Sequence, residues 1–398
     1  MTVKGINQSG LKISNRNKVL RILRQGKSVS RKDISDQTGL TKAAISGIVS
    51  EMIEEKIIVE KGSQDTGTAG RKKIMLEINK KYGYVLGVSI TDTHLICVIA
   101  NVLGETIDVL YHELDVDQLN DMENFVDLII EKLLHILWEN SFPKNCIMGI
   151  GIGYIGSLDE IKIGYIEESI RQRLNIPVYA VNNVKALAMS QMDLYYEETS
   201  ENFLFVKYGP GLGMSIVRNG SIIDGVDNKA GEIGHTIVDI SANTSCRCGR
   251  KGCLESLSSE KGIIKEIEAL GDKYKDLIID RSLIIIDYEK VNYYIKANDE
   301  KILNIFEPRY NYFAKALANS VILFNPEYVS LYGNVFSQPE LFEMISNLVS
   351  SYLGPKTKVI MTLSNLDPRN SAIGPASYAL RELFYHSGGY QQQIMEEE

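Results

Sequence analysis

The most distinctive part of this 398-residue chain reads Ala-Gly-Glu-Ile-Gly-His at residues 230–235 and Cys-Arg-Cys-Gly-Arg-Lys-Gly-Cys-Leu-Glu at residues 246–255. Three thiolates and one imidazole are a suitable ligand set for tetrahedral Zn²⁺, and glycines between the cysteines let a short loop fold back around one ion. Because protein atoms would fill all four coordination positions, no position remains for an activated water, and we expect a structural metal. The predicted zinc ligands are His235, Cys246, Cys248 and Cys253.

The cysteine count and the N-terminus indicate the compartment. The chain has five cysteines, and an odd number argues against a disulfide framework. The first ten residues are polar and lack the apolar segment of a signal peptide, and no run of about 18 apolar residues is present to span a membrane. We therefore expect a cytoplasmic protein with no membrane partner.

The alternatives to a zinc site are three unrelated buried thiols or a redox site.

Charge is distributed unevenly along the chain. Residues 1–81 contain 17 Lys and Arg and 8 Asp and Glu, a net charge of +9, whereas the whole chain carries −8 and the remainder therefore −17. A basic segment joined to an acidic one suggests that only the basic segment meets a polyanion, although chance composition of a solvated surface is the alternative. We predict two domains, residues 1–81 and 82–398.

The basic segment contains the pattern of a helix-turn-helix. Apolar residues have helical spacing at residues 15–25 and again from residue 41 onward. Between them a short helix is expected to begin at Ser30, whose hydroxyl can cap the first turn, with Asp33 as its capping-box partner. Gly39 permits the sharp turn that follows. The apolar stripe of the third helix comprises Ile45, Ile48, Val49, Met52 and Ile53.

This geometry sets a recognition helix into the DNA major groove. The outward residues of the third helix are small, so its backbone can approach the base edges closely. Lys42 and Ser46 are the expected readers of base edges, and Thr41 lies at the start of the same helix. Phosphate contacts are expected from the start of the preceding helix, at Ser30, Arg31 and Lys32.

Two strand-like runs, at residues 57–61 and 74–78, follow the helices, and the segment between them is rich in glycine and basic residues. We predict a wing with Arg71 and Lys72 at its tip, where they can contact the DNA backbone or the minor groove. The caps, the turn, the wing and the charge together favour an N-terminal winged helix-turn-helix that binds double-stranded operator DNA. A three-helix protein-interaction module is the alternative.

Beyond residue 81 the pattern changes to strands that alternate with helices, which predicts an α/β body of two similar lobes. A helix is expected at residues 122–140, and glycine-rich turns at residues 149–156 and 209–213. Such glycines mark either ligand contacts or tight turns. The expected strands lie at residues 84–90, 95–100, 104–111, 147–152, 202–207 and 214–218.

The motif at residues 230–255 resembles the signature of the ROK family, whose name stands for repressors, open reading frames and kinases. The first 81 residues resemble the family's repressor branch in Ser30-Arg31, Thr38-Gly39-Leu40 and Gly70-Arg71. The resemblance covers nearly the whole chain. It implies a two-lobed, actin-like (ribonuclease-H-like) ATPase fold, a homodimer or higher homo-oligomer, and a response to a sugar.

Carried over residue by residue, the resemblance implies the same four zinc ligands and a sugar site between the lobes. Carboxylates beside an imidazole that is held by a metal are suitable acceptors for the hydroxyl groups of a neutral monosaccharide. A surface carboxylate or a helix cap is the alternative reading of each Glu. The implied sugar contacts are Asn182, Glu232, His235 and Glu255.

The same resemblance argues against catalysis. Family kinases carry Asp-x-Gly-Gly-Thr after the first strand of the body, whereas this chain has Ser-Ile-Thr-Asp-Thr at residues 89–93, without the metal-organising carboxylate and both glycines. Pro210 removes an amide donor from the second loop. The general base of the kinases is the Asp of an Asn-Asp pair, which is Asn182-Asn183 here, and an amide cannot accept the sugar's proton. We expect no enzymatic activity.

Three functions are compatible with these patterns. The leading hypothesis is a sugar-responsive transcriptional repressor whose kinase-like effector domain is not catalytic. The second is a transcription factor of the same build that is controlled by a protein partner. The third, an active sugar kinase with an additional DNA-binding domain, is disfavoured by the loop composition.

Overall fold

A computed structural model describes residues 8–24, 28–64, 73–91, 93–114, 118, 121–155, 160–194 and 201–389. The chain divides into two compact units. Unit 1 comprises Met1–Glu197 together with Asn370–Glu398, and unit 2 comprises Glu198–Arg369. The chain therefore leaves unit 1 and returns to it at its C-terminal end. The boundary after residue 81 lies inside unit 1 and stays a prediction.

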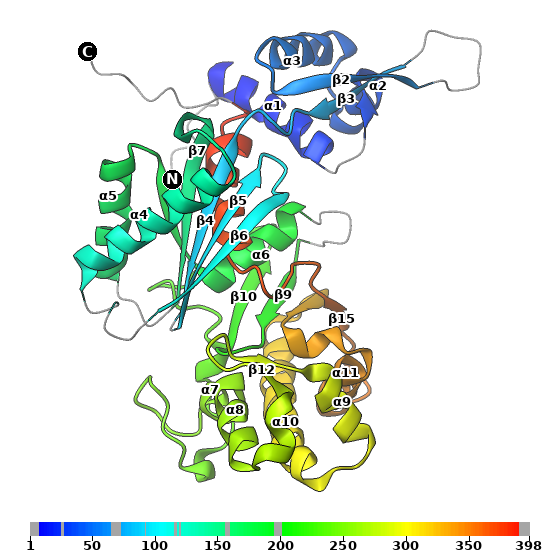
Figure 1. The fold of residues 1–398 in the computed structure, drawn as a ribbon. Coiled ribbons are helices and arrows are strands. Elements are labelled where there is room, and N and C mark those ends of the chain that lie inside the picture. Colours follow the sequence, from blue (N-terminus) through cyan, green and yellow to red (C-terminus); the bar gives the residue numbers. More distant parts are fainter. Residues whose placement is uncertain are drawn as a thin grey trace. The chain divides into compact units, whose positions relative to one another are not determined.

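The N-terminal part of unit 1, which we call the head, has three helices and a small antiparallel sheet of strand order β1-β3-β2 (Figure 1). The described helices match the predicted ones in number and order, and three residues of the predicted apolar stripe, Ile45, Val49 and Met52, are buried. The elements of the head are α1 (Gln8–Arg24), β1 (Val29–Ser30), α2 (Arg31–Thr38), α3 (Lys42–Glu54), β2 (Ile58–Gln64) and β3 (Lys73–Ile78).

Local sequence determines where α2 and α3 begin. The Ser30 side chain accepts a hydrogen bond from the Asp33 backbone N–H, and the Asp33 carboxylate accepts one from the Ser30 backbone N–H, so the predicted capping box is confirmed. Gly39 ends α2 with a φ of +71°, a left-handed conformation that glycine adopts without strain. Thr41 then caps α3 by accepting from the Ala44 N–H.

The remainder of unit 1 is built on a five-stranded sheet of order β6-β5-β4-β7-β8. β4, β5 and β6 are antiparallel neighbours, whereas β7 and β8 continue the sheet in parallel. Helices α4 and α5 cover one face, and α6 and α12 cover the other (Figure 1). The elements are β4 (Tyr84–Ile90), β5 (His94–Asn101), β6 (Thr106–Glu113), α4 (Met122–Glu139), β7 (Ile147–Tyr154), α5 (Glu160–Leu174), β8 (Val178–Asn182), α6 (Asn183–Leu194), α12 (Ile373–Leu380) and the π-helix η8 (Arg381–Tyr385).

The glycines of β7 serve helix packing, which corrects the prediction of a glycine-rich turn from residue 149 onward. β7 continues to Tyr154, and its glycines lie on the face that α12 covers. A Cβ atom on Gly151 would lie 1.8 Å from the Pro375 carbonyl oxygen, and one on Gly149 would lie 2.0 Å from a methyl group of Leu383. The absence of side chains at these positions therefore lets the returning C-terminal segment lie directly on the sheet.

Unit 2 repeats the sheet pattern of unit 1, with the order β11-β10-β9-β14-β15. Its first three strands in chain order are antiparallel neighbours, and β14 and β15 continue the sheet in parallel. The expectation of two similar lobes is therefore met in the topology. The strands are β9 (Phe203–Lys207), β10 (Gly213–Arg218), β11 (Ser221–Ile222), β12 (Ile278–Asp280), β13 (Ile285–Ile286), β14 (Tyr328–Tyr332) and β15 (Ile360–Leu363).

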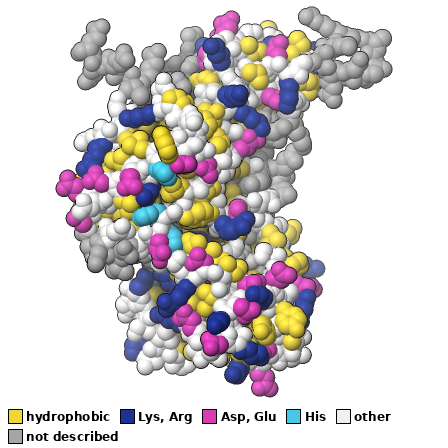
Figure 2. Space-filling model, viewed as in Figure 1, with side chains coloured by type: hydrophobic (Ala, Val, Ile, Leu, Met, Phe, Trp, Pro, Cys, Tyr) yellow, Lys and Arg dark blue, Asp and Glu magenta, His cyan; other side chains and the backbone are white. Residues whose placement is uncertain are grey.

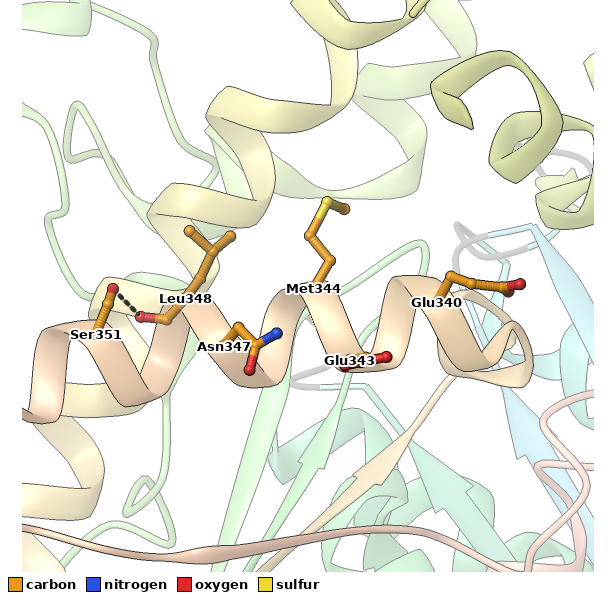
Figure 3. Close-up of a pocket in the computed structure, with 6 residues that line it drawn as sticks. All are labelled: Glu340, Glu343, Met344, Asn347, Leu348 and Ser351. Atoms are coloured by element: carbon orange, nitrogen blue, oxygen red, sulfur yellow. Dashed lines mark hydrogen bonds between the residues drawn. The ribbon is translucent and has the colours of Figure 1, made fainter. Parts of the chain in front are cut away.

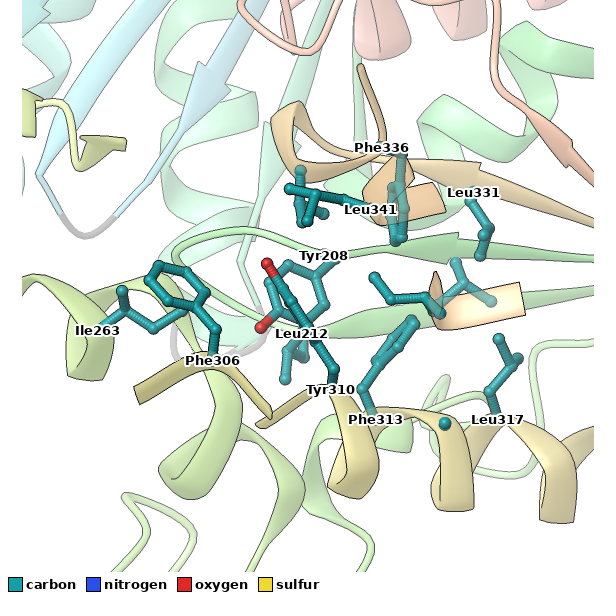
Figure 4. Packing of buried hydrophobic residues seen from close by; sticks show 14 of the residues in the cluster. Tyr208, Leu212, Ile263, Phe306, Tyr310, Phe313, Leu317, Leu331, Phe336 and Leu341 are labelled. Carbon is teal, nitrogen blue, oxygen red and sulfur yellow. The ribbon is translucent and has the colours of Figure 1, made fainter. Parts of the chain in front are cut away.

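Helices and an aromatic cluster complete unit 2. Tyr208, at the end of β9, packs edge-on against Phe313 and Phe336 with ring centroids 5.0 and 6.0 Å away, and its hydroxyl donates to the Ser258 carbonyl oxygen (Figure 4). These contacts fix the loop that follows β9 against the helices. The helices are α7 (Leu254–Ser258), α8 (Glu260–Ala269), α9 (Tyr288–Lys296), α10 (Glu300–Phe324) and α11 (Pro339–Leu353).

Within the described part of the chain, every helix is too short or too polar to cross a lipid bilayer.

The glycine packing gives the first prediction. Gly151→Ala should destabilise unit 1 by about 2–3 kcal/mol, because the added Cβ would overlap the Pro375 carbonyl oxygen. Urea unfolding can be followed by the fluorescence of Trp138, the single tryptophan, which lies on α4 of the same unit. Gly164→Ala is the control, because nothing lies within 4 Å of its Cβ position on α5. Equal midpoints for the two variants would contradict this account of the packing.

Candidate functional site

The four predicted zinc ligands lie together in unit 2. His235 is the last residue of the 3-10 turn η4 (Ile233–His235), and Cys253 directly precedes α7. Two isolated β-bridges, Ile237 with Cys253 and Ser245 with Lys251, close the intervening loop. One donor atom from each ligand residue lies within 4.8 Å of all the others. The cluster can therefore hold a metal ion.

The distances within the cluster fit a tetrahedral site. The Sγ atoms of Cys248 and Cys253 are 3.6 Å apart, and the Cys246 Sγ lies 3.5 Å from the His235 Nδ1. A tetrahedron with Zn–S bonds of about 2.3 Å has an edge of roughly 3.8 Å. Nδ1 is therefore the imidazole atom that faces the cluster, and Nε2 lies on the other side of the ring.

The surroundings of the cluster shift the pKa values of two of its thiols in opposite directions. Hydrogen bonds from the backbone and side chain of Arg250 lower the pKa of the Cys248 thiol to about 6. Burial raises the pKa of the Cys253 thiol to about 12. A bound cation would offset the cost of burying the Cys253 thiolate, so the donor set suits a metal better than an empty loop.

The outer side of the His235 ring faces Glu232. The Glu232 Oε2 lies 3.9 Å from the His235 Nε2, and the Glu232 side chain is 43% exposed. A carboxylate acceptor and an imidazole nitrogen therefore stand next to each other at the surface of unit 2. This is the pairing expected for contacts with sugar hydroxyls.

Glu255 is differently placed from Glu232. Its Oε2 accepts a hydrogen bond from the Leu212 backbone N–H, and its Oε1 lies 3.0 Å from the Arg247 Nε. The side chain is only 14% exposed. Glu255 thus joins the loop after β9 to the loop that carries the cysteines. Sequence reasoning missed its partner Arg247, because the position of an arginine in a loop does not indicate which carboxylate it will contact.

Asn182 and Asn183 belong to unit 1 and have separate roles there. The Asn182 Oδ1 accepts from the backbone N–H groups of Val184 and Lys185 and so caps α6. Asn182 therefore lies in a different unit from Glu232, His235 and Glu255.

Asn183, which the family resemblance aligns with the general base of the kinases, is 2% exposed. Its Oδ1 accepts from the Ser89 hydroxyl, which in turn accepts from the Ser371 hydroxyl. Its Nδ2 donates to the Ile90 carbonyl oxygen at 3.0 Å. Both polar atoms of the amide are used inside unit 1, and an ionised carboxylate here would face a carbonyl oxygen without a donor.

Carboxylates also flank the second glycine loop, at residues 209–213. Glu260 is fully buried, and its Oε2 lies 3.7 Å from the Cβ position of Gly209, while the Glu255 Oε2 lies 3.4 Å from that of Gly211. The Leu212 N–H is already bonded to Glu255. A loop whose amide is occupied and whose neighbours are carboxylates is a poor binding site for a nucleotide phosphate.

Most predicted DNA contacts lie on the surface of the head. Thr41, Lys42 and Ser46 are exposed at the start of α3, and Lys32 is exposed on α2. In Figure 2, Lys and Arg side chains on this face of the head are interspersed with acidic ones. Arg31 is partly exposed and pairs with Glu60.

Two groups of predicted DNA contacts differ from the rest. Ser30 is only 4% exposed, and its hydroxyl takes part in the cap of α2. Arg71 and Lys72, at the predicted wing tip, lie outside the described residues.

A separate open hollow of about 470 Å³ lies along α11 (Figure 3). It contains none of the predicted site residues. Its acidic residue Glu340 is paired with Lys296 and accepts a hydrogen bond from Asn292. The lining residues are Glu340, Glu343, Met344, Asn347, Leu348 and Ser351.

Comparison with known proteins identifies the family. A model of the ROK family matches residues 127–382. This chain belongs to the ROK family. It is 26% identical over 388 residues to the xylose repressor of Bacillus spizizenii, an alignment that covers 94% of this chain and 97% of that repressor. It is 24% identical over 397 residues to the DNA-binding transcriptional dual regulator NagC of Escherichia coli K12, with 95% and 94% coverage.

The solved structures support the fold. A crystal structure of a ROK family transcriptional regulator, a homolog of the Escherichia coli MLC protein, matches this chain with a TM-score of 0.73 and 19% identity. The match covers 95% of this chain and 97% of that one. The body therefore has the actin-like, sugar-kinase-type fold that the sequence predicted.

The buried Glu260 gives a pH prediction. Burial raises the pKa of its carboxyl to about 7, although Tyr288 donates a hydrogen bond to it at 2.7 Å. Between about pH 4.5 and 7 the folded state keeps a proton that the unfolded chain has released, so the free energy of unfolding should fall by about 3 kcal/mol as pH rises through this window.

Thermal unfolding of the full chain across this pH range tests the effect. Glu260→Gln should remove this part of the pH dependence, because the amide does not ionise. Glu289→Gln, an exposed carboxylate on α9, is the control and should keep the dependence. Identical pH profiles for the Glu260 variant and the unmodified protein would refute the assignment.

Proposed function

We propose that this protein is a sugar-responsive transcriptional repressor with a DNA-binding head and a kinase-like body that does not catalyse phosphoryl transfer. The observation that carries the proposal is that the likeness to a named xylose repressor spans head and body together, over 94% of this chain. A sugar kinase would need only the body and not the head.

The head is proposed to be a winged helix-turn-helix. The order of three helices and a β2–β3 hairpin, with a left-handed Gly39 between α2 and α3, supports this. The exposed start of α3 would enter the major groove with Lys42 and Ser46 toward the bases. We propose that the protein binds as a homodimer to two half-sites, because a single short helix reads only a few base pairs.

We propose Zn²⁺ as the metal at His235, Cys246, Cys248 and Cys253, since three thiolates and one imidazole in tetrahedral spacing favour it. With four protein ligands it would stabilise the loop and orient the His235 ring. The Nε2 atom and Glu232 would then be held ready for a sugar hydroxyl. Sugar contacts are proposed for Asn182, Glu232, His235 and Glu255.

Several features support the absence of kinase activity. Asn183 is neutral and buried, and both its Oδ1 and its Nδ2 are hydrogen-bonded, so it offers no base to a sugar hydroxyl. The loop at residues 209–213 is flanked by Glu255 and Glu260, which would repel phosphate when ionised. A body that retains the sugar-facing Glu232 and His235 while lacking these groups suits recognition without turnover.

The metal assignment predicts one zinc ion per chain. Cys248→Ala should lose most of the metal and lower the thermal stability of unit 2, because the loop then lacks one of four ligands. Elemental analysis of the purified protein measures the metal content. Cys146→Ala, outside the cluster, is the matched control and should keep the metal. One equivalent of zinc retained in the Cys248 variant would contradict the ligand assignment.

The recognition helix predicts a specific effect on DNA binding. Lys42→Ala should weaken binding to duplexes selected by the full chain about 10-fold and change the preferred sequence, because the side chain would contact a base edge. Fluorescence anisotropy with selected and scrambled duplexes measures both effects. Lys18→Ala, exposed on α1, removes the same charge from the head and should leave the preferred sequence unchanged. If the two variants behave alike, Lys42 does not read bases.

The sugar site predicts a response that depends on Glu232. Xylose is the first sugar to test, because of the named relatives, followed by N-acetylglucosamine and glucose. An active sugar should weaken the DNA complex roughly 100-fold, an energy difference of about 2.7 kcal/mol.

Glu232→Gln should abolish this response and leave DNA affinity and metal content intact. Glu343→Gln, in the hollow along α11, is the control and should respond normally. A response that survives in the Glu232 variant and is lost in the Glu343 variant would place the effector in that hollow instead. No response of the unmodified protein to any sugar would favour control by a protein partner.

A further inference from the structure

The last described residues of the chain contact the head. We call residues 381–389, which comprise η8 and the turn after it, the C-terminal hook. The hook follows α12 directly, and three residues separate Arg369, the last residue of unit 2, from the start of α12. The π-helical geometry of η8 is uncommon and frequently occurs at functional positions.

Arg16 of α1 is the centre of this contact. The residue is fully buried, and its Nε donates to the Gly388 carbonyl oxygen at 2.6 Å. Its Nη1 and Nη2 donate to the two carboxylate oxygens of Glu55, the residue that ends α3. One guanidinium therefore joins the hook to both the first and the third helix of the head.

The two glycines of the hook leave little room for side chains. Gly388 and Gly389 have φ values of +72° and +82°. A Cβ on Gly388 would lie 3.1 Å from the Arg16 Cβ, and one on Gly389 would lie 2.9 Å from a methyl group of Ile57. The Gly389 carbonyl oxygen also accepts from the Tyr82 hydroxyl. The hook thus depends on glycine for both its conformation and its closeness to the head.

A second contact lies at the end of α1. The Arg24 guanidinium stacks over the ring of Tyr385 in the hook, with its Cζ 3.9 Å from the ring centroid. Its Nη1 lies 3.5 Å from a carboxylate oxygen of Asp193 at the end of α6, and only 8% of the Arg24 side chain is exposed. The Arg381 Nη1 lies 3.6 Å from the other oxygen of Asp193.

Two segments from the body therefore converge on α1. One is the C-terminal segment that the chain enters on leaving unit 2, which runs through α12 into the hook. The other is α6, whose first turn is capped by Asn182 and whose last turn carries Asp193. The two segments pack closely, since a Cβ on Gly374 of α12 would lie 3.1 Å from the Leu187 nitrogen of α6.

We propose that the C-terminal hook fixes the orientation of the head on the body, with Arg16 and Arg24 as the positioning residues, and that loosening it is how the body would release DNA. The regulatory part of this inference rests on the proposed function. Asn182, a proposed sugar contact, caps α6, and α6 contacts α1 of the head through Asp193. The returning C-terminal segment contacts the same helix through the hook. A change in either would alter the support of α1.

Two pairs of matched variants of the full chain test the proposal. Arg24→Gln removes the stacking and the ion pair, and Arg21→Gln makes the same charge change at an exposed position of α1. Gly388→Ala adds a methyl group against Arg16 at a φ of +72°, and Gly354→Ala adds one at the same φ with nothing within 4 Å. The second member of each pair controls for charge or for backbone strain.

Hydrogen exchange and DNA affinity are the two measurements. We expect amide exchange in α1 to accelerate about 10-fold in Arg24→Gln and Gly388→Ala, with exchange in β4 and β7 unchanged, and little change in either control. Affinity for selected duplexes should fall about 10-fold in the same two variants, since a loosely held head binds at an entropic cost.

Unchanged exchange in α1 would overturn the hook as a structural support. Faster exchange with unaltered DNA affinity would overturn its role in positioning the head for DNA. If the unmodified chain selects no duplex, the proposed function and the regulatory role fail together, and the exchange measurement still decides whether the hook holds the head.

Discussion

The hydrogen bonds among Ser89, Asn183 and Ser371 are the interaction on which unit 1 depends. They join three parts of the chain that are remote in sequence: β4, the start of α6, and the segment that leads into α12. All three side chains are buried and neutral, so the network costs little to bury once it is satisfied. α12 continues into the C-terminal hook, and the last turn of α6 carries Asp193. Both elements that contact the head therefore start from this network.

One feature in each unit supports the proposed loss of chemistry. Phosphoryl transfer to a sugar needs a base for the hydroxyl group and donors or cations for the phosphate. Here Asn183 has both polar atoms engaged, and the loop at residues 209–213 is flanked by Glu255 and Glu260. Glu232 and His235, by contrast, keep polar atoms at the surface of unit 2. The exposed polar atoms of unit 2 and the satisfied amide inside unit 1 each support the proposal of recognition without turnover.

Local patterns were predictable from sequence, and long-range contacts were not. The Ser30 capping box, six of the ten strands of the two large sheets and the His235–cysteine cluster follow from spacing over a few residues, so they could be predicted. Ser371 lies 282 residues from Ser89, and no local pattern indicates that they meet. The glycines of β7 suggested a turn because glycine is common there, whereas their actual cause is the close approach of α12. Likewise, nothing near Gly388 in sequence indicates Arg16 as its neighbour.

The central claim is that the body recognises a sugar without using ATP. Isothermal titration calorimetry of the full chain with magnesium and a non-hydrolysable ATP analogue, with and without a saturating sugar, tests it most directly. The account predicts binding of a sugar near Glu232 and His235 but no nucleotide binding up to about 1 mM, which corresponds to less than roughly 4 kcal/mol of binding free energy. Stoichiometric nucleotide binding in the micromolar range, strengthened by the sugar, would contradict this claim and would favour an active sugar kinase.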